Sequence, residues 1–190
     1  MKILVTGGLG YIGSHVVVEL LERNYEVLVI DNLSNSSLDV LNGIEGICGK
    51  KPDFENIDVR NKLDLQDFFQ RNQDIQGVIH FAASKAVGES VENPLLYYEN
   101  NINALVYLLQ ELQDQPQTHL IFSSSCTVYG QADELPIKES APVKPAESPY
   151  GNTKQIGEEI IRDVCKVKPS FKAIAPVSYT HLTLPTTPYV

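Results

Sequence analysis

The stretch Lys2-Ile-Leu-Val-Thr-Gly-Gly-Leu-Gly-Tyr-Ile-Gly-Ser-His15 decides the fold of this chain. It begins with an apolar run of strand type, and helical spacing of apolar residues follows directly after it, at Val16, Val17, Leu20 and Leu21. Gly7, Gly10 and Gly13 lie between the two, as a tight strand-to-helix turn requires. The N-terminus of such a helix has unpaired N–H groups and a partial positive charge, which suits the pyrophosphate of a dinucleotide.

An acidic residue closes the second apolar run. Asp31 follows Leu28-Val-Ile30 and lies 18 residues after Gly13, close to the offset of about 20 residues expected for a carboxylate that binds the adenosine ribose. Such a carboxylate accepts from the 2′-hydroxyl and repels a 2′-phosphate, so the sequence predicts NAD rather than NADP as cofactor. A purely structural glycine turn is the alternative, but the complete strand, turn, helix, strand and Asp unit favours nucleotide binding.

Composition limits the classes of protein. The 190 residues suffice for one well-buried domain, with hydrophobic and charged fractions of 43% and 21%. The net charge of −9 argues against nucleic acid or an anionic membrane as partner, and no apolar run approaches the roughly 18 residues of a membrane helix. No signal peptide precedes the first strand, and the three widely spaced cysteines, Cys48, Cys126 and Cys165, indicate neither disulfides nor a metal site. These features favour a cytoplasmic protein.

Strand and helix patterns alternate along most of the chain, which predicts an α/β fold with a doubly wound parallel sheet (Rossmann) and helices on both faces. Strands are expected at 2–6, 26–30, 54–57, 77–82 and 119–124, and helices near 12–23, 62–71, 94–113 and 150–167. Residues 32–51 are expected to form a loop with one short helix, and residues 128–149 a loop. Asn61 is a candidate helix cap, and Pro94 fits a first helical position. Ala173-Ile-Ala175 can begin a sixth strand, which Pro176 would end or place at an edge.

Two further segments carry candidate chemistry. Leu120–Gly130 is a strand that ends in hydroxyl side chains, and Ser148-Pro-Tyr-Gly-Asn-Thr-Lys154 begins a helix. Tyr150 and Lys154 are four residues apart and share a helical face. A neighbouring ammonium favours the phenolate and lowers the pKa of the phenol from its usual value of about 10, which makes Tyr150 a candidate general base. Ser125, at the end of the strand, is placed to hydrogen-bond the reacting oxygen.

A third segment, Phe81-Ala-Ala-Ser-Lys85, follows a buried strand and is placed to line the cofactor site. Each segment has a structural alternative: a chance Tyr-x-x-x-Lys spacing, turn chemistry for the serines and a solvated surface charge for Lys85. His80 is expected to be a core imidazole and His15 to face the second strand, so neither is predicted to be a ligand. The order of the three segments behind the glycine turn favours catalysis.

The chain resembles the extended short-chain dehydrogenase/reductases, and within them the UDP-glucose 4-epimerases, from Met1 to about Ala175. The segments that carry the resemblance are Val5–His15, Asp31–Asn35, Lys85–Val91, Tyr97–Asn101, Ser123–Gly130 and Ser148–Lys154. The third and fourth of these separate the epimerases from generic relatives. Nucleotide-sugar 4,6-dehydratases carry Thr-Asp-Glu where this chain has Ser125-Cys-Thr127, so the chain lacks their extra carboxylates for elimination.

The resemblance implies an NAD-dependent isomerase that interconverts UDP-glucose and UDP-galactose in galactose metabolism. Tyr150 would take the proton of the sugar 4-hydroxyl, Ser125 would assist, and Lys154 would hold the ribose and tune Tyr150. Together with the residues already named, motif matching gives a set of expected NAD contacts: Gly7, Gly10, Tyr11, Ile12, Gly13, Asp31, Asn32, Asp58, Val59, Phe81, Ala82, Ala83, Lys85, Asn100, Ser125, Tyr150 and Lys154.

The resemblance also implies a homodimer through the helices at 94–113 and 150–167. On the first helix an apolar stripe is expected, which packing on the sheet would also explain in part, at Tyr97, Tyr98, Leu105, Leu108 and Leu109.

The family continues past the sixth strand with Leu-Arg-Tyr-Phe-Asn-Pro and a carboxy-terminal domain that grips the UDP-sugar. This chain instead reads Ala175-Pro-Val-Ser-Tyr-Thr-His181, and it has no charged residue after Lys172. The expected organisation is therefore an NAD-binding Rossmann domain over 1–175, a substrate domain that is largely absent, and an atypical tail over 176–190 that is foreign or disordered.

Three functions fit the sequence. The first is the NAD-binding part of a UDP-glucose 4-epimerase, with UDP-glucose and UDP-galactose as substrates. The second is a non-catalytic module that holds NAD. The third is a related nucleotide-sugar 4-epimerase acting on a hexuronate or an N-acetylhexosamine, since the residues that choose the sugar belong to the absent domain.

Overall fold

Six parallel strands form the sheet of this protein, as a computed structural model shows for residues 1–113, 115, 118–134 and 136–177. The strands are β1 Lys2–Thr6, β2 Glu26–Ile30, β3 Asp53–Glu55, β4 Gly77–His80, β5 His119–Phe122 and β6 Ala173–Ile174. Their order in the sheet is β3-β2-β1-β4-β5-β6. The order reverses between β1 and β4, which confirms the predicted doubly wound sheet and places its ligand crevice at their carboxyl ends.

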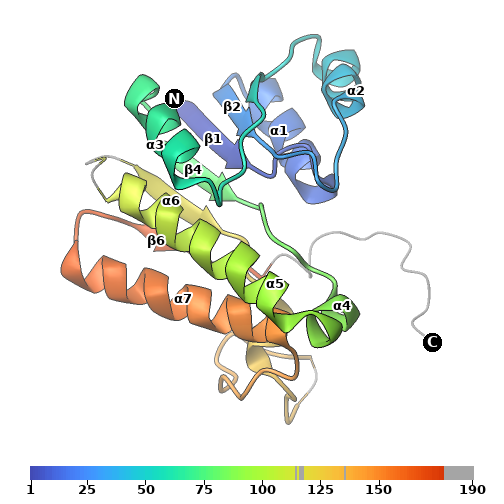
Figure 1. Ribbon diagram of the computed structural model, residues 1–190, viewed down its shortest axis with the longest axis vertical. Helices are drawn as coiled ribbons and strands as arrows, with labels where there is room; N and C mark the ends of the chain where they lie inside the picture. Colours follow the sequence, from blue (N-terminus) through green and yellow to red (C-terminus); the bar gives the residue numbers. More distant parts are fainter. Residues whose placement is uncertain (114, 116–117, 135, 178–190) are drawn as a thin grey trace.

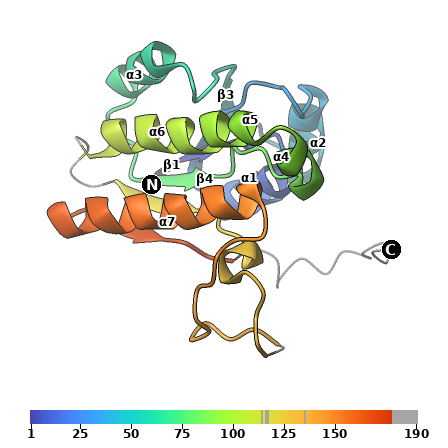
Figure 2. The ribbon, with the colours of Figure 1, turned by 60° about the horizontal axis from the view of Figure 1, so that its bottom comes forward.

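Helices cover both faces of the sheet (Figure 1). On one face lie α1 Tyr11–Glu22 and α2 Asp39–Cys48. On the other lie α3 Lys62–Arg71, α6 Ala104–Leu112 and α7 Pro149–Val167, and Figure 2 shows α6 and α7 side by side across it. The shorter elements are α4 Val87–Glu92, α5 Pro94–Tyr98, the π-helical turn η1 Glu99–Asn103 and the 3₁₀ turn η2 Cys126–Tyr129.

The core consists of two apolar layers, one on each face of the sheet. On β1, Leu4 packs in the layer under α3 and α6, whereas Ile3 and Val5 pack in the layer under α1. All three side chains are almost completely buried. Burial on both faces explains why the strands read as continuous apolar runs rather than as alternating patterns. Each fully buried aliphatic side chain of this kind stabilises the fold by about 1.5–3 kcal/mol.

Most element positions agree with the sequence prediction. Strands β1 and β2 and helix α3 have the predicted bounds, and the predicted cap is present, because Asn61 accepts hydrogen bonds from the N–H groups of Leu63 and Asp64. Pro94 begins a helix as expected. The short strand β6 is confirmed at the sheet edge, where the N–H of Ser124 donates to the carbonyl of Pro176 at 3.1 Å.

The predicted helix over 94–113 is confirmed as helical backbone from Pro94 to Leu112, in which α5, the π-helical turn η1 and α6 follow one another without a break. A further helix, α4, precedes it and lies outside the predicted elements. Asn93 separates α4 from α5, because its φ of −129° and ψ of 62° are not helical. The expected apolar stripe is directed inward: Tyr97, Leu105 and Leu108 are 0% exposed, so packing within this chain accounts for them.

The tail expected over 176–190 lies mainly outside the described residues. Of the two tail residues that the structure describes, Val177 forms an isolated parallel bridge with Ser124. Among the helices of the described ranges, none combines the length and the apolar character that crossing a membrane would require.

Candidate functional site

The glycine turn between β1 and α1 forms the floor of the site. Gly7 has a φ of 66°, and a Cβ at this position would lie 2.7 Å from the backbone nitrogen of Ala82, so a side chain does not fit. A Cβ at Gly13 would lie 2.3 Å from the carbonyl oxygen of Gly7, and its absence lets α1 pack on the turn. Among the described side chains, none caps α1, whose N-cap is Gly10. The first-turn N–H groups and the helix dipole are therefore directed at the crevice, where they suit a phosphate.

Asp31 lies beside this turn, at the carboxyl end of β2. Its buried carboxylate accepts hydrogen bonds from the N–H of Leu9 at 3.1 Å, the N–H of Leu33 at 2.9 Å and the hydroxyl of Ser36 at 2.9 Å. A carboxylate has about four acceptor positions, so these three bonds orient it and leave room for one hydroxyl donor. The geometry fits a carboxylate that receives a ribose hydroxyl.

Asp58 and Asn32, two further predicted cofactor contacts, hydrogen-bond to each other. The carboxylate of Asp58 accepts from Asn32 Nδ2 at 3.0 Å and from Arg60 Nη2 at 2.7 Å. The hydrogen bonds from Arg60 are the main cause that lowers the pKa of Asp58 to about 2. Because the carboxylate also accepts from the Arg60 backbone, its acceptor positions are largely occupied by the chain itself. Val59 is buried in the core, so only its backbone can face a ligand.

The segment after β4 is held by a buried amide. Asn101 accepts from the N–H of Ser84 at 2.8 Å and donates to the carbonyl of Ser84 and to the hydroxyl of Thr153, both at 3.0 Å. It therefore joins the β4 loop, η1 and α7 at one point. Asn100, its neighbour, donates to the hydroxyl of Ser84 at 3.0 Å. Lys85, one residue further along the loop, is exposed.

The three predicted catalytic residues lie together at the N-terminal end of α7 and the end of β5. The ammonium of Lys154 donates to the carbonyl of Ser123 at 2.9 Å and lies 5.8 Å from the ring centroid of Tyr150. Lys154 is only 4% exposed, and its Nζ also lies 4.8 Å from the ring centroid of Phe122. Ser125 accepts hydrogen bonds from the N–H and the hydroxyl of Thr127 at 3.3 and 3.0 Å, and its side chain lies near the Tyr150 phenol. The structure thus brings a phenol, a hydroxyl and a buried ammonium to one edge of the crevice.

The predicted effect of Lys154 on Tyr150 is wrong for the chain by itself. Burial raises the pKa of Tyr150, and the nearby Ser125 side chain opposes this rise only in part. Lys154 lies over the face of the phenol ring and is engaged by the Ser123 carbonyl, and burial lowers the pKa of its ammonium to about 8. Tyr150 is therefore a protonated phenol at neutral pH in the free chain.

His80 and His15 lie in different environments. His80 is 2% exposed, its Nδ1 lies 2.7 Å from the hydroxyl of Thr6, and its ring stacks on Phe122. Burial lowers its pKa to about 3, so the predicted neutral core imidazole is confirmed. His15 is exposed rather than turned toward β2, and its Nδ1 donates to the carbonyl of Tyr11 at 2.7 Å.

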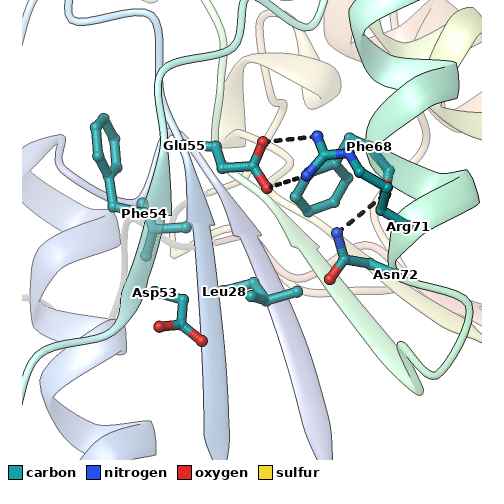
Figure 3. A pocket seen from close by; sticks show the side chains of 8 residues that line it. Leu28, Asp53, Phe54, Glu55, Phe68, Arg71 and Asn72 are labelled. Carbon is teal, nitrogen blue, oxygen red and sulfur yellow. Dashed lines mark hydrogen bonds and ion pairs between the residues drawn. The ribbon is translucent and has the colours of Figure 1, made fainter.

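Two hollows lie away from the predicted residues. One, of about 330 Å³, lies between β3 and the end of α3 and contains the paired Glu55 and Arg71 (Figure 3). The other, of about 350 Å³, is lined by Tyr98, residues 145–149 and the α7 residues Asn152 and Gln155. Neither hollow is lined by any residue of the predicted cofactor set.

Sequence reasoning missed several residues that build the site. Asn101 and Thr153 were passed over, although an asparagine among apolar residues of a predicted helix indicates a buried amide that needs partners. Arg60 hydrogen-bonds the Asp58 carboxylate, and the Asp-x-Arg spacing after a predicted strand could have indicated this pair. Glu89 and Tyr97 hydrogen-bond across a helix break that no periodicity indicated.

The reversed strand order, the glycine turn beneath α1 and the Tyr150–Lys154 pair at the same edge define a dinucleotide-binding domain of the short-chain dehydrogenase/reductase class. Comparison with known families agrees with this class. The chain belongs to the NAD dependent epimerase/dehydratase family, whose model matches residues 3–182.

Individual relatives are consistent with this family. The chain is 48% identical over 171 residues to UDP-glucose 4-epimerase of Pasteurella multocida, which covers 90% of this chain and 50% of the relative. Among solved structures, UDP-glucose 4-epimerase from Bifidobacterium longum in complex with NAD+ and UDP is similar with a TM-score of 0.89 and 42% identity, over 92% of this chain and 52% of that one. The UDP-Glc/GlcNAc 4-epimerase from Campylobacter jejuni is similar with a TM-score of 0.85 and 33% identity, over 94% and 56%. The chain spans about half the length of the curated relatives it matches.

Proposed function

We propose that this chain is the cofactor-binding half of an NAD-dependent UDP-glucose 4-epimerase, an isomerase that interconverts UDP-glucose and UDP-galactose. The observation that carries the proposal is the grouping of Tyr150, Ser125 and Lys154 at the carboxyl edge of a reversed parallel sheet, the same edge at which the glycine turn lies. The relatives from Pasteurella multocida and Bifidobacterium longum, both UDP-glucose 4-epimerases, support the substrate.

The crevice has the features that NAD requires. The glycine turn leaves no side chain between the backbone and a pyrophosphate, and the α1 N-terminus is directed at the same place. Asp31 has one acceptor position left for a ribose hydroxyl, and its charge disfavours a 2′-phosphate. The buried ammonium of Lys154 is placed to donate to a second ribose. The backbone of the β4 loop and Asn100 would line the nicotinamide side.

In the proposed reaction NAD, when bound, supplies the acceptor and later the donor of a hydride. Tyr150 removes the proton of the sugar 4-hydroxyl as the C4 hydrogen leaves as hydride, which gives a 4-keto sugar. Tyr150 returns the proton when the hydride is delivered to the opposite face of the keto group. Ser125 hydrogen-bonds the reacting oxygen through both steps. Because burial raises the pKa of Tyr150 in the free chain, the base becomes competent only when the nearby positive charges, Lys154 and the cofactor, act together.

The deciding experiment is a coupled assay on purified chain 1–190. Because the chain spans about half the length of its relatives, we expect at most slow conversion of UDP-galactose to UDP-glucose, and mass spectrometry of the denatured chain should detect retained NAD. A chain that retains NAD but converts neither sugar would instead be the non-catalytic NAD-binding module. A chain that neither retains nor binds added NAD would overturn both interpretations.

A related 4-epimerase is the second candidate. The similarity to the Campylobacter jejuni UDP-Glc/GlcNAc 4-epimerase favours including UDP-N-acetylglucosamine beside UDP-glucose in the assay. Equal rates with both substrates would extend the proposed function to N-acetylhexosamines.

We also propose a homodimer in the cytoplasm. Exposed apolar residues on α4 and α5 support a partner surface: Val91 is 61% exposed and Leu95 is 80% exposed. Light scattering on the chain and on its Leu95→Glu variant tests the dimer, which the variant should convert to a monomer.

A further inference from the structure

A second tyrosine lies directly behind Tyr150. Tyr97, the fourth residue of α5, is 0% exposed, and its ring meets that of Tyr150 edge to face, with centroids 6.4 Å apart and planes at 80°. An edge-to-face pair is the favoured arrangement for two aromatic rings, because the positive edge of one meets the negative face of the other. The contact therefore defines the plane of the Tyr150 ring as well as filling space beside it.

Tyr97 is itself held by a carboxylate. Its phenol donates to Oε2 of Glu89 at 2.6 Å, from α5 across the break at Asn93 to α4. Glu89 is an exposed residue, so this pair is the outer end of a chain of contacts that runs inward to the crevice. Burial and the hydrogen bond to Glu89 raise the pKa of Tyr97 to about 12. Tyr97 consequently stays a neutral hydrogen-bond donor while Tyr150 changes its protonation state.

We propose that Tyr97, anchored by Glu89, is a positioning residue that fixes the ring plane of Tyr150. The inference rests on the proposed role of Tyr150 as the base. It assigns a function to the segment of α4 and α5 that the described catalytic groups do not use. Ser125, Cys126 and Lys154 also lie near the Tyr150 side chain, and the ammonium of Lys154 lies over the face of the ring, 5.8 Å from its centroid.

The helix break at Asn93 makes this arrangement possible. Glu89 and Tyr97 are eight residues apart, which in one straight helix would put about 12 Å of rise between them. Because the helix is broken at Asn93, α4 contacts α5 and the carboxylate reaches the phenol. The separate helix α4 is thus part of the positioning device.

The test compares Tyr97→Leu, Glu89→Ala and Glu89→Gln in chain 1–190 that carries ¹³C at tyrosine Cζ, with the Tyr150 signal assigned from Tyr150→Phe. Both Glu89 variants lose the same charge, but glutamine still offers an oxygen to the Tyr97 phenol. We expect Tyr97→Leu to admit water beside Tyr150 and to lower its pKa toward the usual value of about 10. Glu89→Ala should shift the Tyr150 signal in the same direction, and Glu89→Gln should leave it as in the unmodified chain.

Two results would overturn the proposal. The first is a Tyr150 signal and pKa that stay unchanged in Glu89→Ala while the Tyr97 signal moves, which would show that the pair has broken without consequence. The second is an equal response to Glu89→Ala and Glu89→Gln, which would make the effect one of charge. Because Glu89 is exposed, these two variants give the answer even when Tyr97→Leu does not fold. The spectra can be recorded without turnover. If Tyr150→Phe had normal activity, the proposed function would be refuted, but the measured effect of Tyr97 and Glu89 on the Tyr150 signal would still stand.

Discussion

The ammonium of Lys154 donates to the carbonyl oxygen of Ser123 at 2.9 Å, which joins α7 to the end of β5. Among the described residues, no carboxylate forms an ion pair with this buried cation. The cost of burying this charge is therefore offset by the Ser123 carbonyl dipole and by the ring faces of Phe122 and Tyr150. The arrangement costs stability and keeps a positive charge ready for a ligand at the crevice.

Replacing this cation should stabilise the free chain. The pKa of Lys154 is about 8 in the fold and about 10.4 when unfolded, so the unfolded chain binds more protons between these values and stability rises with pH across that window. Below pH 8 the full penalty applies. We expect Lys154→Met to gain up to roughly 3 kcal/mol at pH 7 and to lose the rise between pH 8 and 10. Urea unfolding of both chains at pH 7, 8 and 10 measures this. Free energies of unfolding that change with pH in parallel for the two chains would contradict the prediction.

Acid should destabilise the chain through His80. Its pKa of about 3 lies below the unfolded value of about 6.5, so the neutral imidazole contributes stability above pH 6.5 that is lost as the pH falls toward 3. One such group gives a slope of up to about 1.4 kcal/mol per pH unit. His80→Gln keeps a partner for Thr6 and should flatten the curve between pH 6 and 4.5. This interval lies above the window in which Asp58 titrates. An unchanged slope would show that His80 is protonated in the fold.

Two Gly→Ala substitutions, one in the glycine turn and one in α2, should have opposite effects on stability. At Gly13 the new Cβ would meet the Gly7 carbonyl at 2.3 Å, and backbone atoms there cannot move aside. We expect Gly13→Ala to lose about 1–3 kcal/mol of stability and all retained NAD. At Gly43, inside α2, a Cβ would meet no atom of another segment within 4 Å, so Gly43→Ala should gain about 0.5–1 kcal/mol. Thermal unfolding and mass spectrometry check both; a Gly13→Ala chain that still retains NAD would contradict the expectation.

Asp31 should determine the choice between NAD and NADP. Removing its carboxylate eliminates both the ribose acceptor and the repulsion of a 2′-phosphate. We expect Asp31→Ala to weaken NAD binding about tenfold or more, equivalent to roughly 1.4 kcal/mol, and to narrow the preference over NADP. Calorimetry on chain freed of cofactor measures both affinities. Asp39→Ala, at the first residue of α2, removes the same charge elsewhere and serves as control. An unaltered ratio of the NAD and NADP affinities in Asp31→Ala would count against Asp31 as the residue that binds the ribose.

Removing the Tyr150 hydroxyl should stop the reaction without removing the cofactor. Tyr150→Phe keeps the ring that meets Tyr97 but cannot accept the sugar proton. We expect turnover of UDP-galactose by chain 1–190 to fall at least about 10²-fold, the size of a general-base contribution, with retained NAD unchanged. Near-normal turnover would exclude Tyr150 as the base.

Much of the fold follows from local patterns. The glycine turn, the acidic end of β2 and the apolar strand runs each specify a local structure, and the doubly wound sheet is the arrangement that buries all of them. Asn61 could be predicted as a cap because the residues that it binds are its immediate neighbours. The sequence also placed Tyr150 and Lys154 on one helix face, since four residues are about one turn.

What could not be predicted depends on contacts between distant segments. The orientation of Lys154 is set by the Ser123 carbonyl, 31 residues away, and no helical spacing contains that information. The burial that raises the pKa of Tyr150 comes from packing against residues such as Tyr97, which is 53 residues away in the chain, and no local pattern contains that contact. Asn101 joins three segments that become neighbours only in the folded chain.

The π-helical turn η1 makes the register of this region sensitive to length. One extra residue within the turn sets the direction in which Asn101 points, toward Ser84 and Thr153. Deleting one residue between Glu99 and Asn103 would restore ordinary α-helical winding and, because a π-helical turn absorbs one extra residue, would leave α5 and α6 in the same relative orientation. A variant shorter by one amino acid would thus keep its packing on the sheet and lose the wide turn that directs Asn101 at Ser84 and Thr153.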